Sequence, residues 1–268
     1  MTGAVRLGAW RLWIAAGAAG DAAAWRDAVA TVVEEERPIH RSRHAATYRW
    51  RRPGGDVFVK VYRRAAGTTA LKDLVRPSKA RRAERMSARL AAAGLGAPRV
   101  LAVGEERRGG VVRCAWLATA ALDGAPAAAA VARMDAAADR RATLAGVGTA
   151  VAELHRAGFV AGDLVAPNVW LTPARPGGRV TFLDHDRTVR CRGAAPWWRA
   201  RRNLVQLNRL ELPGVTATDR LRVYRAYAGA RGWRWPAARR RLGWIVAKTA
   251  ARRRRIAGRA ARRREGGA

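Results

Sequence analysis

A group of acidic and amide residues in the middle of the chain has the types and spacing that phosphoryl transfer requires. Asp163 and Asn168 lie five positions apart in FVAGDLVAPNVWL, and Asp184 follows sixteen positions later at the end of VTFLD. Phosphoryl transfer needs an acceptor hydroxyl placed in line and Mg²⁺ held by oxygen ligands. The spacing predicts that Asp163 accepts the acceptor's proton and that Asn168 and Asp184 bind metal. The alternative is that Asp163 and Asn168 only form turns.

A lysine and a glutamate earlier in the chain are candidates for holding the phosphoryl donor. Lys60 lies in the strand-like segment VFVKVY and is one of only four lysines among 53 basic residues. A Lys kept in an Arg-rich chain favours a site that needs a compact ammonium, such as nucleotide phosphates. Glu84 lies on a predicted helix, where it could orient Lys60. The alternatives are a solvated lysine and a surface ion pair between Glu84 and neighbouring arginines.

The elements around these residues change in character along the chain. TYRW and VFVKVY flank a Pro-Gly-Gly turn and predict a β-hairpin, and Ser78 can cap a helix that ends near Ala93. A Gly-, Pro- and Ala-rich stretch at 122–131 is the best candidate for a linker. The other predicted elements are strands at 99–104 and 111–118, a helix at 143–157, a hairpin at 169–184 and helices at 198–210, 219–230 and 236–264.

This order of elements predicts an α+β protein with a two-lobed, protein-kinase-like fold. The predicted N-terminal lobe covers residues 1–121 and is rich in β-strands, with one main helix. The predicted C-terminal lobe covers 122–235 and is mostly helical. A basic helical tail is predicted over 236–268.

The motifs together resemble a known family. LHRAGFVAGDLVAPNVWL, FLDHDRTVR and RRNLVQLNRL are similar to segments of the bacterial lipopolysaccharide kinases, which phosphorylate Kdo or heptose sugars of the inner core. VFVKVYRR and SKARRAERMSARLAAAGLGAPRVLAVGE resemble the N-terminal lobe of that family, so the likeness covers about residues 41–232. It implies ATP and Mg²⁺ as cofactors and a lipopolysaccharide core glycolipid as substrate.

The resemblance also assigns roles to individual residues. It implies that Lys60 and Glu84 form an ion pair, that Asp163 is the catalytic base, and that Asn168 and Asp184 bind Mg²⁺. It further implies structural support from Asp186, Arg187 and the helix around 203–209.

Two features depart from the family pattern. Ala161 occupies the catalytic-loop position that usually holds His, and no Gly-rich nucleotide loop is visible; Gly54 and Gly55 lie in the turn before Lys60. Reduced activity follows as one expectation. The alternatives to a lipopolysaccharide kinase are a kinase with another acceptor, and a degenerate pseudokinase acting as a basic module that binds membrane or nucleic acid.

The distribution of charge predicts an anionic partner. The formal net charge is +33, and residues 190–268 contribute +20 of it, although the Arg and Ala bias also fits a GC-rich genome. We expect the partner to be the anionic inner-membrane surface rather than nucleic acid. No apolar run approaches the roughly 20 residues of a membrane span. Two lone cysteines, Cys114 and Cys191, favour a reducing compartment, so a peripheral cytoplasmic location is predicted.

Both ends of the chain allow two interpretations. Near the N-terminus, LWIAAGAAGDAAA resembles a short signal peptide, but Asp21 interrupts it. Near the C-terminus, 239–264 contains twelve basic residues and no acidic one. Apolar residues there recur at helical spacing, which is typical of a helix that binds a membrane surface and equally of one that packs on the C-terminal lobe. These apolar positions are Leu242, Ile245, Val246 and Thr249.

Overall fold

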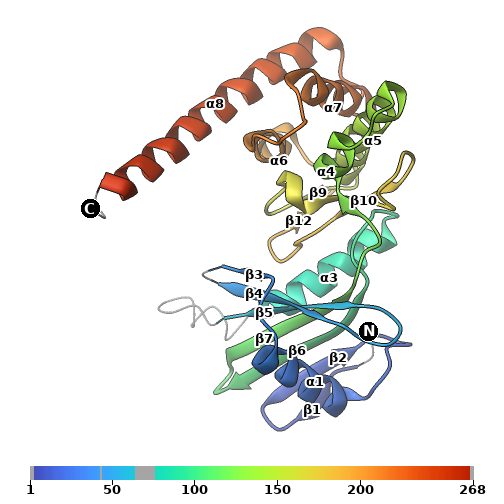
Figure 1. The fold of residues 1–268 in the computed structure, drawn as a ribbon, viewed down its shortest axis with the longest axis vertical. Helices are drawn as coiled ribbons and strands as arrows, with labels where there is room; N and C mark the ends of the chain where they lie inside the picture. The colour runs from blue at the N-terminus through green and yellow to red at the C-terminus, as the bar shows by residue number, and fades with distance from the viewer. Residues whose placement is uncertain (1–2, 43, 64–75, 266–268) are drawn as a thin grey trace. The chain divides into compact units, whose positions relative to one another are not determined.

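The chain folds into two compact units in the computed structural model, which describes residues 3–42, 44–63 and 76–265 (Figure 1). The first unit comprises Met1–Ala92, Ala97–Leu122 and His185–Arg187, and the second comprises Ala93–Gly96, Asp123–Asp184 and Thr188–Ala268. Parts of the predicted N-terminal lobe and tail, at 1–2, 43, 64–75 and 266–268, lie outside the described residues. The architecture mixes helices with antiparallel sheets, as the sequence predicts.

An antiparallel sheet organises the described part of the first unit. Its strands lie in the order β1-β2-β6-β7-β5-β4-β3. The predicted hairpin is present as β4 and β5, joined by the Pro-Gly-Gly turn, and the later predicted strand pair is β6 and β7. The strands are β1 Val5–Leu7, β2 Trp10–Ile14, β3 His40–Arg41, β4 Ala45–Trp50, β5 Val57–Tyr62, β6 Val100–Arg108 and β7 Val111–Ala120.

Helices cover both faces of this sheet, because successive side chains of a strand point to opposite faces. In β7, Trp116 joins the apolar cluster that α1 (Ala22–Glu35) completes, whereas its neighbour Leu117 joins the cluster that includes α3 (Lys79–Ala92). The predicted cap of α3 is confirmed, since Ser78 Oγ accepts a hydrogen bond from the α3 backbone at 3.1 Å.

The prediction of one main helix in this part of the chain is wrong, because α1 and α3 each have 14 residues. Asp21, which interrupts the signal-like stretch, is the N-cap of α1 and accepts a hydrogen bond from Ala24 N at 2.8 Å. Trp25, Val29 and Val32 are buried at positions i, i+4 and i+7 of the helix. This apolar face anchors α1 to the sheet.

The second unit contains a small sheet, a strand pair and several helices. The sheet has the order β11-β10-β8, and β12 pairs with β9. The elements are β8 Ala125–Pro126, α4 Ala127–Ala132, α5 Ala137–Arg156, β9 Phe159–Val160, the 3₁₀ helix η1 Ala166–Asn168, β10 Val169–Thr172, β11 Arg179–Phe182, β12 Val189–Arg190, α6 Trp197–Arg209, α7 Ala217–Ala230 and α8 Trp235–Glu265.

Close packing and a buried carboxylate hold α7 against α5. A Cβ on Gly148 of α5 would lie 2.2 Å from the carbonyl oxygen of Val223, so only glycine permits this approach. Asp219 forms a capping box with Thr216 at the start of α7. The same carboxylate is 1% exposed and binds Arg140 of α5 at 2.6 Å, and the hydrogen bond from Arg140 holds the pKa of Asp219 well below its ordinary value. The start of α7 is therefore fixed to α5.

The first part of α8 belongs to the packed body of the second unit. Ile245 and Thr249 are 3% exposed, and Thr249 Oγ1 accepts a hydrogen bond from Asn208 of α6 at 3.2 Å. Tyr224 donates to the carbonyl of Ala238 at 2.6 Å, and Arg253 donates to a carbonyl of α6 at 2.9 Å. Packing on the unit therefore accounts for Ile245 and Thr249 of the apolar stripe of α8, whereas Val246 of the same stripe is 53% exposed.

We expect truncation after Trp235 to unfold the second unit, because it exposes the α6 and α7 surfaces that α8 covers. Truncation after Arg255 keeps these contacts and is the matched control. Circular dichroism and size-exclusion chromatography of the two proteins check this prediction. A monomeric, folded protein ending at Trp235 would contradict it.

Candidate active site

The loop 161–168 between β9 and β10 carries two of the predicted site residues. Asn168 ends this loop in η1, and its Nδ2 donates a hydrogen bond to the main-chain oxygen of Asp163 at 3.0 Å. The amide nitrogen is therefore fixed by the loop. Its oxygen is the atom that is left to act as a ligand, and an oxygen is what Mg²⁺ prefers.

Asp184 lies next to this loop because of the hairpin formed by β10 and β11. Val169 pairs with Phe182, and the next residue, Leu183, donates its N–H to the oxygen of Asn168 at 2.9 Å. The hairpin thus brings Asn168 and Asp184 to the same end of the two strands. Asp184 has φ 61°, a left-handed conformation that Asp tolerates better than most residues.

Helix α6 holds the loop in place through two amide side chains. Asn203 Oδ1 accepts from Ala161 N at 2.9 Å and its Nδ2 donates to Ala161 O at 2.7 Å. Gln206 Nε2 donates to Gly162 O and to Asp163 Oδ1, each at 3.1 Å. One carboxylate oxygen of Asp163 is therefore positioned by α6, as the predicted role of general base would require.

Asn203 binds the main chain of Ala161, which occupies the loop position that usually holds His. Ala161 has no side-chain hydrogen bond to offer, yet both polar groups of its main chain bind Asn203. The support expected from the 203–209 helix is thus confirmed for Asn203 and Gln206. The sequence signal that could have identified Gln206 as a support for the loop is its position three residues after Asn203, where a second amide follows on a helix whose charged residues are all arginines.

A buried histidine connects this helix to α7. Asn203 Oδ1 accepts from Ala161 N, so it must also accept from His155 Nε2–H at 3.1 Å. His155 Nδ1 then accepts from the Tyr227 hydroxyl at 2.9 Å. Burial lowers the pKa of His155 from 6.5 to about 4, so the imidazole is neutral near pH 7.

Lys60 and Glu84 belong to the first unit. Lys60 of β5 pairs with Leu117 of β7, so its side chain lies on the sheet face that α3 covers. The Nζ atom of Lys60 is 5.3 Å from the ring centre of Tyr62. Glu84 is 5% exposed, and its carboxylate binds Arg81, whose guanidinium stacks over Trp13 at 4.4 Å. The ion pair seen for Glu84 is a buried one with Arg81 rather than the surface pair considered from the sequence.

The oxygen donors of the second unit suit a hard cation. Among the described residues, no group of three or more His, Cys, Asp and Glu side chains could hold a metal ion. A cation here would depend on Asn168, Asp184 and oxygens of a phosphate ligand, which is how Mg²⁺ is commonly bound. The two residues fit such a role, and their assignment stays a prediction.

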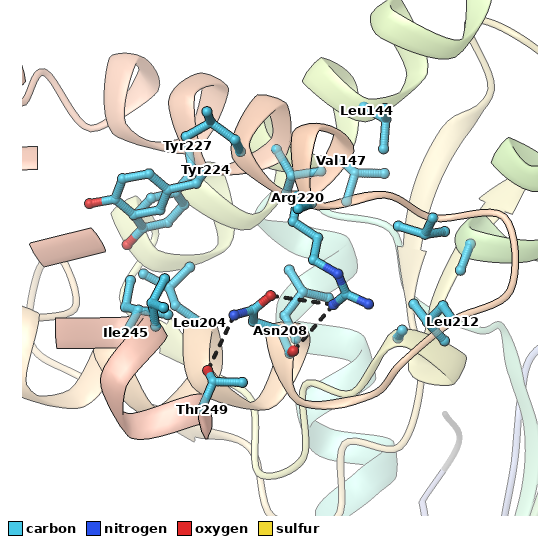
Figure 2. Close-up of a pocket in the computed structure, with 18 of the residues that line it drawn as sticks. Leu144, Val147, Leu204, Asn208, Leu212, Arg220, Tyr224, Tyr227, Ile245 and Thr249 are labelled. Carbon is cyan, nitrogen blue, oxygen red and sulfur yellow. Dashed lines mark hydrogen bonds between the residues drawn. The ribbon is translucent and has the colours of Figure 1, made fainter. Parts of the chain in front are cut away.

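A separate apolar cavity of about 830 Å³ lies in the second unit (Figure 2). Helices α5, α6, α7 and α8 supply most of its lining, including Leu144, Leu204 and Ile245. Arg220 donates to Asn208 at its polar side, and Asn208 in turn donates to Thr249. The sequence did not predict this cavity.

Comparison with known proteins agrees with this fold. A family model for the lipopolysaccharide kinases (Kdo/WaaP) matches residues 23–227. The chain therefore belongs to the lipopolysaccharide kinase (Kdo/WaaP) family, as its motifs suggest. Among solved structures, it is similar to WaaP in complex with acyl carrier protein, with 22% identity and a TM-score of 0.62 over 84% of this chain and 91% of that one. This likeness shows a shared fold.

Comparison with curated proteins found no significant match. Among the helices that the structure describes, none is both long and apolar enough to cross a membrane.

The burial of His155 predicts a pH-dependent stability. The unfolded chain takes up a proton as the pH falls below 6.5, whereas the folded chain resists protonation until about pH 4. The contribution of His155 to stability should therefore fall by about 3 kcal/mol across that range and change no further below it. Urea denaturation as a function of pH measures it. His155→Gln should lose this part of the dependence, and an unchanged profile in that variant would contradict the assignment.

Proposed function

We propose that the chain is an ATP-dependent kinase that phosphorylates a Kdo or heptose sugar of the lipopolysaccharide inner core. The observation that carries the proposal is the loop that holds Asp163 and Asn168. Gln206 of α6 binds the carboxylate of Asp163, and Leu183, the residue before Asp184, binds the main-chain oxygen of Asn168. Family membership supports kinase activity on lipopolysaccharide. In this proposal the regions 1–121 and 122–235 act as the two lobes of a protein-kinase-like fold, with 236–268 as a basic extension.

The reaction follows from the roles of these side chains. A sugar hydroxyl gives its proton to the carboxylate of Asp163 while its oxygen bonds to the γ-phosphorus of ATP and the bond to the leaving ADP oxygen breaks. Gln206 holds one oxygen of that carboxylate, which leaves the other for the hydroxyl. Mg²⁺ bound by Asn168 and Asp184 would supply charge neutralisation at the phosphates.

Lys60 and Glu84 would complete nucleotide binding. A Lys ammonium on the sheet face covered by α3 suits contact with the α- and β-phosphates. Glu84 on α3 is proposed to orient Lys60. Arg81 binds the Oε2 atom of the same carboxylate, so in this proposal Glu84 serves two cations.

Substitution of the proposed base separates catalysis from binding. Asp163→Asn should lower turnover by on the order of 10²- to 10⁴-fold and leave ATP affinity nearly unchanged, because this carboxylate does not hold nucleotide. Asp184→Asn is the matched contrast and should weaken Mg-ATP binding. Transfer of labelled phosphate from ATP to core glycolipids of defined truncation, together with calorimetry, measures both.

The alternative of a degenerate binding module predicts a different result. The wild-type chain would then show no phosphate transfer to any truncated core glycolipid, and Asp163→Asn would change nothing measurable. Full activity of Asp163→Asn would remove Asp163 from the mechanism while leaving the kinase assignment in place.

The proposed acceptor is anionic and embedded in a membrane, so we also propose a peripheral location at the cytoplasmic face of the inner membrane. The charge of +20 in residues 190–268 supports this partner, since each basic residue near an anionic leaflet contributes about 1 kcal/mol.

We further propose that the apolar cavity receives an acyl chain. The cavity is lined by aliphatic side chains from four helices, and its volume of about 830 Å³ lies in the range of ligand sites. Of the arginines that line it, Arg254 is exposed and suits an anionic group at the end of such a chain, whereas Arg220 and Arg253 bind main-chain carbonyls at the end of α6. The structural relative WaaP was solved with acyl carrier protein, which makes an acyl-bearing partner a candidate here.

A fluorescent fatty acid tests the cavity directly. Leu212 lines the cavity from a half-buried loop position, so Leu212→Trp should narrow the cavity. The affinity for the probe should then fall by on the order of 10-fold. Leu210→Trp, two positions earlier, lies outside the lining and should bind as wild type does. Equal affinities of all three proteins would contradict the proposal.

A further inference from the structure

Five of the eleven tryptophans lie in two stretches of the second unit that contain no acidic residue. These stretches are 189–210 and 220–264. The structure brings three of these rings together where α6 begins, α7 ends and α8 begins. Trp197 is 5.5 Å from Trp233 and 5.9 Å from Trp244, measured between ring centres. We call these three rings, with Trp198, Trp235 and the cations stacked on them, the Trp/Arg cluster.

Cations cover the rings of the cluster. Arg241 lies 3.9 Å from the centre of Trp233, Arg201 lies 4.6 Å from Trp244, and Lys248 lies 5.9 Å from the same ring. Stacking of this kind stabilises a guanidinium that is partly removed from water. The cluster is thus a surface where aromatic rings and positive charge coincide, without carboxylates from these stretches to neutralise it.

Packing explains the half-buried members of the cluster but not the exposed ones. Trp197, Trp233 and Trp244 are half-buried and connect α6 to α8. Trp198 is 59% exposed and Trp235 is 45% exposed, each with a single arginine stacked on its ring. Large apolar side chains so exposed within one basic region indicate an interaction surface.

We propose that the Trp/Arg cluster binds the surface of an anionic lipid bilayer. Trp is enriched at membrane interfaces, where its ring reaches the acyl boundary and its N–H stays among polar groups. Arg and Lys beside it bind lipid phosphates. The choice of a bilayer over nucleic acid rests on the proposed function, because the glycolipid acceptor lies in a membrane.

The cluster also stands close to the proposed chemistry. Trp198 and Gln206 lie eight residues apart on the same helix, which is about 12 Å along its axis. Since Gln206 binds Asp163, a bilayer seated at the start of α6 would hold the catalytic loop within reach of a sugar headgroup. The Trp/Arg cluster is a different surface from the far end of α8, where further arginines follow Arg253 and the packed part of that helix.

Vesicle binding by the full chain tests the proposal. Vesicles of phosphatidylcholine mixed with phosphatidylglycerol should bind the wild-type protein and shift its Trp emission to shorter wavelengths. Trp198→Ala/Trp235→Ala should lower the affinity by on the order of 10-fold or more, because the bilayer would bury both rings. Circular dichroism confirms that this variant is folded.

A second variant addresses charge. Arg234→Gln/Lys248→Gln removes two exposed cations of the same region and should lower affinity for the mixed vesicles by on the order of 10-fold, with a weaker salt dependence. Arg133→Gln/Arg141→Gln removes two exposed arginines near the other end of α7 and is the matched control, expected to bind within a few-fold of wild type.

The outcomes are distinct. Unchanged vesicle binding by the Trp variant overturns the proposal, and so does a Trp variant that loses only its binding to single-stranded DNA. Phosphate transfer to a soluble core-sugar analogue should be the same in the wild type and both cluster variants. If the wild type lacks that activity, the proposed function fails while the vesicle result still stands.

Discussion

The arrangement of the candidate site depends on the pairing between the amide of Asn203 and the main chain of Ala161. The N–H and the carbonyl of Ala161 both bind the side chain of Asn203, which also accepts a hydrogen bond from the buried His155. A buried amide or imidazole left without its partner costs about 1–3 kcal/mol, so the members of this network stabilise one another. Tyr227 extends the network to α7, and Gln206 extends it to the carboxylate of Asp163. The geometry of the loop is therefore a property of three helices.

Sequence reasoning identified most elements of the second unit, because periodic apolar patterns and glycine stops are local signals. It does not predict α1, because an Ala-rich sequence is ambiguous and an Asp such as Asp21 can either interrupt an apolar run or cap a helix, as it does here. The loop spacing predicted that Asn168 and Asp184 lie together, since a hairpin leaves few other arrangements. The ion pair of Glu84 with Arg81 is local, since the two residues lie three positions apart on α3. The burial of that pair, with Arg81 stacked over Trp13, and the apolar cavity depend on contacts between distant segments, which local patterns do not encode.

The large positive charge has several different uses in this structure. Arg140 is bound to a buried carboxylate, Arg253 satisfies carbonyls at the end of α6, and Arg241 lies against aromatic rings. Each of these arginines has a structural partner, so net charge overstates the number that are available to bind an anion. What distinguishes the Trp/Arg cluster is the exposed aromatic surface that accompanies its charge.

The left-handed backbone of Asp184 restricts how this protein can change over evolutionary time. A β-carbon in that conformation costs about 1–2 kcal/mol, and only Gly, Asn and Asp adopt it readily. Glu would keep the negative charge but not the backbone geometry, whereas Asn and Gly would keep the geometry but lose the charge. Both are reached from an Asp codon by one base change. Relatives that have lost activity while keeping the fold are therefore expected to carry Asn or Gly here, which gives a way to recognise them from sequence.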